Sequence, residues 1–187
     1  MAKIFVDAHV HFHEQDAAGD VIEHALERAE ALGGRLVLLF ADPRGESGFS
    51  RFREVAGAPE FVLEDTGEAE SFVLHRAHGR PGQGVAVCRG RQWVSQEGVE
   101  VLHLLAPLDP SEARLEGERL PLGPLLAALW PRTGVVVLPW GFGKWLGRRR
   151  SLLRARGREA AASGRTLFSG DIRARCWPWP SPRRTLP

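Results

Sequence analysis

Uninterrupted apolar runs of strand length constrain this chain more than any other feature. Arg35–Phe40 is one such run, and residues 134–138 form another. Because their hydrophobicity is continuous rather than alternating, both predict strands that are buried on two faces, as in a parallel sheet covered by helices. With an N-terminal strand from residue 4 and a helix between, the first run completes a strand–helix–strand order that predicts a βαβ unit with parallel strands.

The helix of this unit is predicted over residues 20–32. Asp20 with Glu23 three residues later matches a capping box, and Gly33 provides a stop. Its apolar stripe at helical spacing consists of Ile22, Ala25, Leu26, Ala29 and Leu32.

The order of the remaining elements predicts an α/β fold built as a reduced or incomplete TIM-barrel-like parallel sheet. Five strands of parallel type can be counted, against eight in a closed barrel. Residues 61–97 break this pattern with short β-rich runs separated by turns, which predict an antiparallel β-hairpin insertion. We expect a single domain over residues 1–176, followed by a Pro/Trp-rich tail over residues 177–187.

Histidines follow the first apolar strand at every second position. In an extended strand, Asp7, His9, His11 and His13 would line one face. Imidazoles on one face of a short segment are suited to binding a divalent metal. The alternative is an edge strand that exposes its histidines. His103, within a later apolar strand, is predicted to be a satisfied core histidine.

The turn after the 134–138 strand predicts an anion-binding loop. Gly141 and Gly143 allow backbone N–H groups to approach a ligand, and Lys144 adds a positive charge at the start of a helix. Trp140 completes this candidate substrate-binding set. The alternative is a glycine turn whose tryptophans pack on the core or serve as stacking platforms for a sugar or small acid.

Acidic residues at two further strand ends complete the candidate site. Asp42 follows the strand that ends at Phe40, so in a parallel sheet it shares a rim with the histidines. Asp171, after the last strand, could ligate a metal or act as a general base, and Arg173 could hold an oxyanion. A simple ion pair between Asp171 and Arg173 would explain both residues equally well.

The opening segment Asp7-Ala8-His9-Val10-His11 resembles the start of the amidohydrolase and PHP (polymerase and histidinol phosphatase) families of metal-dependent hydrolases. This resemblance implies a barrel with divalent ions (Mn, Zn or Fe) at the strand carboxyl ends. It also implies His9 and His11 as metal ligands, while Asp171 matches the late acidic ligand. Asp7 joins this metal-binding set as a ligand or a support. The predicted activity is hydrolysis of a small, anionic, phosphorylated substrate rather than of an amide, with Asp42 and Asp171 as catalytic residues.

Charge is distributed unevenly along the chain. From residue 144 onward there are twelve Lys or Arg residues against two acids, whereas the net charge of the whole protein is only +2. The basic C-terminal third predicts an anionic partner as an alternative function, in which a catalytically degenerate relative binds rather than hydrolyses. Nucleic acid is a less favoured partner than a small substrate. The sequence shows no membrane span or signal peptide, so we expect a cytoplasmic protein without a membrane partner.

Overall fold

The chain divides into two compact units in the computed structural model, Met1–Arg91 and Gln92–Pro187. Each unit contains one β-sheet and one hydrophobic core. The structure describes residues 3–13, 16–33, 35–79, 83–107, 115, 117, 119–139 and 148–170.

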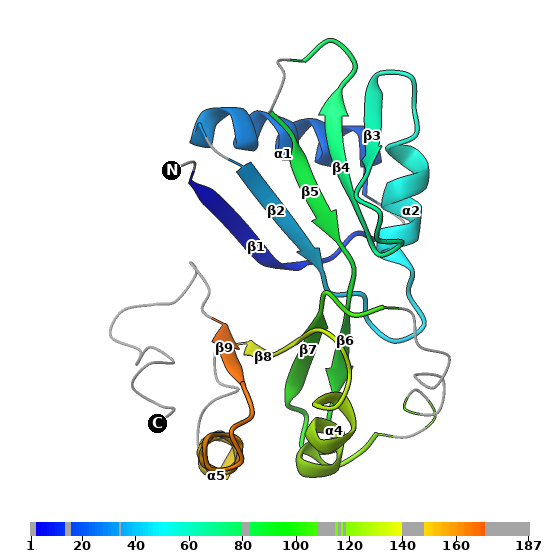
Figure 1. Ribbon diagram of the computed structural model, residues 1–187. Coiled ribbons are helices and arrows are strands. Elements are labelled where there is room, and N and C mark those ends of the chain that lie inside the picture. Colours follow the sequence, from blue (N-terminus) through cyan, green and yellow to red (C-terminus); the bar gives the residue numbers. More distant parts are fainter. Residues whose placement is uncertain are drawn as a thin grey trace. The chain divides into compact units, whose positions relative to one another are not determined.

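The sheet of unit 1 has five strands in the order β1-β2-β5-β4-β3 (Figure 1). Strands β1, β2 and β5 pair in parallel, whereas β4 is antiparallel to both β5 and β3. Two helices, α1 and α2, connect the first three strands in sequence. The bounds are β1 Ile4–Val10, α1 Ala18–Leu32, β2 Arg35–Phe40, α2 Gly48–Val55, β3 Phe61–Asp65, β4 Ser71–Arg76 and β5 Val85–Cys88.

Helix α1 forms because an apolar stripe of helical period can be buried against the sheet. The stripe predicted from the sequence is buried at Ile22, Ala25, Leu26 and Ala29. The helix ends where Gly33 adopts a left-handed conformation with φ of 59°, which costs glycine little. A βαβ unit is therefore present, with β1 and β2 parallel as predicted.

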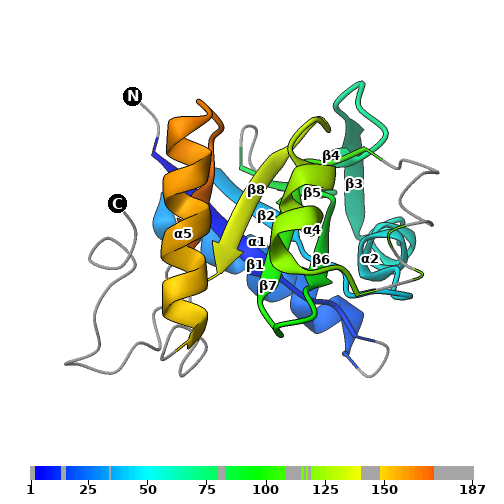
Figure 2. The ribbon, with the colours of Figure 1, turned by 90° about the horizontal axis from the view of Figure 1, so that it is seen from below.

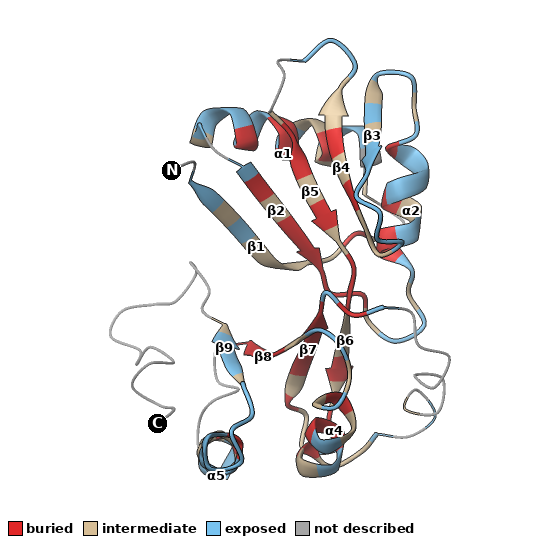
Figure 3. Cartoon of the chain, viewed as in Figure 1, coloured by how far each residue is buried: buried red, intermediate tan, exposed pale blue. Residues whose placement is uncertain are grey.

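Both helices of unit 1 cover the same face of its sheet, since one cluster joins their apolar residues to alternate positions of the strands (Figure 3). Leu36, Leu38 and Phe40 of β2 point into this cluster, as do Phe49 and Phe52 of α2. The edge-to-face contacts of Phe40 with Phe49 and of Phe12 with Phe52 add to the burial. The chain segment carrying Phe12 is thereby fixed directly after β1.

Unit 2 has a four-stranded sheet in the order β6-β7-β8-β9, with two helices packed on one face (Figure 2). Strands β7 and β8 are antiparallel, and β8 and β9 are parallel. The bounds are β6 Gly90–Val94, β7 Glu100–Leu104, α4 Leu122–Leu129, β8 Val135–Pro139, α5 Arg148–Ala162 and β9 Phe168–Gly170. The core combines leucines of α4 with Leu153 of α5 and with apolar strand residues.

The predicted TIM-barrel-like parallel sheet is wrong. The described strands form two separate mixed sheets, and neither closes on itself. Continuous hydrophobicity correctly indicated burial, but burial does not determine the direction of a strand's partner: β8 is buried yet pairs antiparallel with β7. The antiparallel pairing at 61–88 is present. Strand β6, however, belongs to the second sheet, so the turn at Arg89 does not make a hairpin.

Within the described residues, no helix combines the length and the hydrophobicity needed to cross a bilayer.

Candidate functional site

Three imidazole rings lie next to one another where β1 ends. The ring centroids of His9 and His11 are 4.7 Å apart, and those of His11 and His13 are 5.8 Å apart. Because β1 ends at Val10, His11 and His13 follow the strand rather than continuing its alternation. The sequence therefore predicted the grouping of the histidines, although it placed His11 within the strand.

Asp42 is brought to the same end of the sheet by the parallel pairing of β1 with β2. The backbone N–H of Ala41 donates to the carbonyl of Val10 at 2.9 Å, so the two strand ends meet directly. Asp42 is only 2% exposed. Its Oδ2 accepts a hydrogen bond from the backbone N–H of Phe49 at 3.1 Å, in the first turn of α2. The predicted convergence of Asp42 with the histidine segment at one rim is thus present in unit 1.

A glycine at the start of α2 makes this close approach feasible. A Cβ on Gly48 would lie 2.7 Å from Asp42 Oδ1 and 2.8 Å from the carbonyl oxygen of Phe12. Neither distance is compatible with a side chain at that position. Gly48 thus lets the first turn of α2 contact both strand ends, and the helix N-terminus stabilises the buried carboxylate.

The electrostatic environment favours the neutral form of His11. Burial lowers the pKa of its imidazole, and the neighbouring rings of His9 and His13 lower it further, against a raising effect of the Ala41 backbone. Its Nδ1 is buried and, among the described residues, has no hydrogen-bond partner. A neutral imidazole with a nitrogen lone pair available is the form that binds a metal.

The pKa of Asp42 is raised above the usual value of an aspartate. Burial raises this pKa, and the effect exceeds the lowering by the Phe49 N–H and by the guanidinium groups of Arg91 and Arg89. A buried carboxyl group that holds its proton more tightly than usual is suited to proton transfer.

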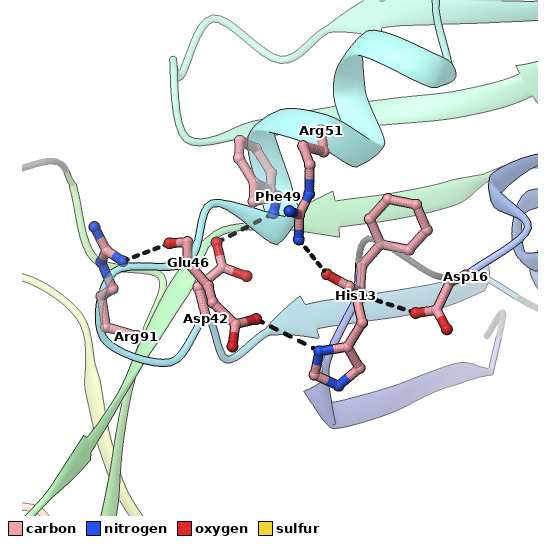
Figure 4. Close-up of polar contacts among 8 residues, drawn as sticks. His13, Asp16, Asp42, Glu46, Phe49, Arg51 and Arg91 are labelled. Carbon is pink, nitrogen blue, oxygen red and sulfur yellow. Dashed lines mark hydrogen bonds and ion pairs between the residues drawn. The ribbon is translucent and has the colours of Figure 1, made fainter.

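Polar residues from the loop after β2, from α2 and from the start of β6 lie around this pair of strand ends (Figure 4). Glu46 Oε2 lies 3.5 Å from His13 Nδ1, and the carbonyl of Glu46 accepts a hydrogen bond from Arg91 at 3.0 Å. Arg51 of α2 donates to the carbonyl of Phe12 at 2.9 Å. Glu46, Arg51 and Arg91 were not predicted to belong to the site. The available signal was the polar loop directly after Asp42, at a strand carboxyl end.

Asp7 lies away from these contacts. Its carboxylate is 3.7 Å from Arg28 of α1, so it contacts the helix that covers the sheet. The β1–β2 register shifts between Asp7 and Val10, which interrupts the regular alternation along β1. This geometry supports a role of Asp7 in attaching the helix.

The remaining predicted site residues lie outside the described part of the chain. These are the candidate substrate-binding residues Trp140, Gly141, Gly143, Lys144 and Arg173, together with the candidate ligand and base Asp171. The 177–187 tail is also outside it.

The described residues fit part of a metal site. The orphaned Nδ1 of His11 and the proximity of its ring to that of His9 suit two nitrogen ligands, which bind zinc at about 2.0–2.1 Å. Among the described residues, no group of three or more His, Cys, Asp or Glu side chains is arranged to hold an ion. Further ligands are therefore not provided by the described residues in this arrangement of side chains.

No known family, curated protein or solved structure matches this chain.

Proposed function

We propose that this protein is a metal-dependent hydrolase of small phosphoesters, with the metal at the carboxyl end of β1. The observation that carries the proposal is the buried Nδ1 of His11, which has no hydrogen-bond partner among the described residues and lies between two other imidazoles. A buried polar atom without a partner costs about 1–3 kcal/mol. Binding an ion at this nitrogen would offset that cost.

His9 and His11 would hold the metal, and the ion would supply Lewis-acid catalysis of hydrolysis. Asp171 as a further ligand stays a prediction from the opening motif's resemblance to amidohydrolase and PHP enzymes. Burial keeps His11 in the neutral state that ligation requires.

Asp42 would transfer a proton during hydrolysis. Its raised pKa brings the carboxyl group closer to the pH at which it can both accept and release a proton, while the Phe49 N–H fixes Oδ2. The positive charges of Arg89 and Arg91, which act on the Asp42 carboxylate, favour an anionic substrate. A role in phosphate binding for Lys144, Arg173 and the loop containing Trp140, Gly141 and Gly143 stays a prediction from the sequence.

The metal-binding step is tested by thermal unfolding of the full chain with Mn²⁺, Zn²⁺ or Fe²⁺, alongside elemental analysis of the purified protein. An ion at a hundred times its dissociation constant would stabilise the fold by about 2.7 kcal/mol. We expect this shift in wild type and in the control His24→Ala, whose histidine lies exposed on α1. His9→Ala and His11→Ala should lose it.

Catalysis is tested with p-nitrophenyl phosphate as the substrate. Asp42→Asn should retain the metal-induced thermal shift but lose roughly 10²–10⁴-fold in kcat, as expected for removal of a general acid–base group. Absence of bound metal together with identical melting curves in all three metals would refute the proposal.

A further inference from the structure

Helix α5 and the residues that follow it are strongly basic. Over residues 148–170 there are seven arginines against one acid, Glu159, a net charge of +6. The arginines are Arg148, Arg149, Arg150, Arg154, Arg156, Arg158 and Arg165. From this surface we propose that α5 binds the phosphodiester backbone of a nucleic acid, independently of base sequence.

The core uses only a narrow stripe of α5. Leu153 and Ala160, two helical turns apart, are 1% and 2% exposed, while most other positions of the helix are exposed or half-buried (Figure 3). A helix that is polar around most of its circumference gains little from packing. Arg148 and Arg158 thus occupy exposed positions of the helix, which its packing on the core does not use.

Three of these arginines form a row that opposes the stability of the helix. Arg150, Arg154 and Arg158 follow one another at four-residue spacing, so their side chains are neighbours along the helix. Arg158 is exposed, and Arg150 and Arg154 are half-buried. Like charges at this spacing destabilise a helix by about 0.2–0.5 kcal/mol per pair. An anion bound along the row would relieve this repulsion.

Intramolecular contacts neutralise only part of the charge. Arg156 pairs with Glu159, and the guanidinium of Arg165 lies 4.8 Å from the ring centroid of Trp130. Within the described residues, no carboxylate forms an ion pair with Arg148 or Arg158, both of which are exposed. Part of the positive surface is therefore available to a partner.

The chemistry of this surface matches phosphodiesters. The guanidinium group presents a planar fork of donors that binds phosphate oxygens in pairs. Arg148 and Arg158 are ten residues apart, which corresponds to about 15 Å along a helix. One strand of a duplex presents roughly four phosphates over that length. Contacts to the backbone alone carry no base specificity.

An anionic membrane fits α5 less well. Helices that lie on a bilayer insert a broad apolar face beneath their basic residues. The apolar residues of α5, including Leu153, are instead buried in the core of unit 2. The helix has no second apolar face to place in lipid.

The experiment measures binding of the full chain to labelled 20-nucleotide single-stranded DNA, single-stranded RNA and duplex DNA by fluorescence anisotropy from 50 to 300 mM NaCl. We expect affinity to fall linearly on logarithmic axes as salt rises. Combined substitution of Arg150, Arg154 and Arg158 by Gln should weaken duplex binding at least tenfold at 100 mM NaCl. The same substitution should make the slope of log affinity against log salt concentration shallower by about 2–3, which corresponds to about 0.9 per lost phosphate contact.

A matched variant with Lys at the same three positions keeps the charge and should retain most of the salt dependence. Circular dichroism and the melting temperature verify that each variant is folded. His9→Ala should bind nucleic acid like wild type, so this result is independent of the hydrolase proposal. Three outcomes would overturn the inference: no binding at 50 mM NaCl, equal binding by the Gln variant, or binding to phosphatidylserine vesicles but to none of the nucleic acids.

Discussion

His11 in unit 1 and His103 in unit 2 share one electrostatic signature but occupy different surroundings. Burial lowers the pKa of each, and each has a buried ring nitrogen without a well-aligned hydrogen bond among the described residues. His11 lies just past a strand end, beside His9 and His13. His103 lies within β7, where it pairs with Val136.

The difference shows that a perturbed histidine indicates a site only through its neighbours. Around His11 there are further imidazoles and the strand end that carries Asp42, which is chemistry a ligand can use. His103 is 1% exposed and lies one strand position from the buried residues Leu102 and Leu104. Burial lowers the pKa of His103 despite the opposing effect of the Thr133 backbone. For His103, burial of the polar ring is a cost to stability.

The comparison is tested most strongly by replacing His103 with Leu. Neither ring nitrogen of His103 makes a well-aligned hydrogen bond among the described residues, so removing them should stabilise the protein by about 1–3 kcal/mol. The effect should grow as pH falls below 6.5. Below pH 6.5 the unfolded state protonates His103, whereas the folded state, with its lowered pKa, keeps the imidazole neutral. The wild-type protein therefore loses stability as pH falls below 6.5.

The measurement is urea unfolding between pH 5 and pH 8, with hydrogen exchange of β7 peptides to localise the gain. The metal-induced thermal shift expected at the β1 end should not change in His103→Leu. If that variant lost the metal response, or were less stable than wild type at every pH, the distinction between the two histidines would be wrong.

The sequence predicted unit 1 better than unit 2 for a physical reason. In unit 1 the apolar strands are joined through a helix with a clear stripe and stop, which determines a parallel pair and hence which strand ends meet. In unit 2 the buried strand β8 pairs with β7 on one side and β9 on the other, in opposite directions. Residue hydrophobicity is the same for both directions, so the barrel expectation failed there.

Within the site, regular spacing was the informative signal. Alternate histidines and an acid after a strand were visible in the sequence, and His9, His11 and Asp42 lie at one end of the sheet. Glu46 and Arg51 were not predictable, because their contacts arise from how the loop and α2 return to the strand ends. Such contacts have no periodicity along the chain.

Asp42→Asn tests whether the buried charge at the unit 1 site lowers the free energy of unfolding. Because burial raises the pKa of Asp42, its ionised form destabilises the folded state at pH values above that pKa. This destabilisation disappears as pH falls and the carboxyl group is protonated. The amide keeps an acceptor for the Phe49 N–H without the charge. We expect a gain of about 0.5–2 kcal/mol at neutral pH, the range typical of stabilising substitutions, shrinking toward pH 4.

Chemical denaturation at pH 7 and pH 4 measures this gain. Asp16→Asn serves as a control. The Asp16 carboxylate also accepts a hydrogen bond from a backbone N–H, that of His13, at a half-buried position of the segment after β1. A loss of stability in Asp42→Asn at pH 7 that shrinks toward pH 4 would contradict this prediction, because it would mean that the charge of Asp42 supports the fold.

The smallest expected effect concerns Asp7, whose contact with Arg28 distinguishes a support from a metal ligand. The carboxylate is 40% exposed and the guanidinium side chain 49%, and such surface ion pairs contribute about 0–1 kcal/mol. Asp7→Asn should therefore cost no more than about 0.5 kcal/mol, matched by Arg28→Gln, and the two changes combined should cost little more than either alone. The metal-induced thermal shift should persist in all three variants. Its loss in Asp7→Asn but not in Arg28→Gln would place Asp7 among the metal ligands, and the metal site would then extend from the end of β1 back into the strand.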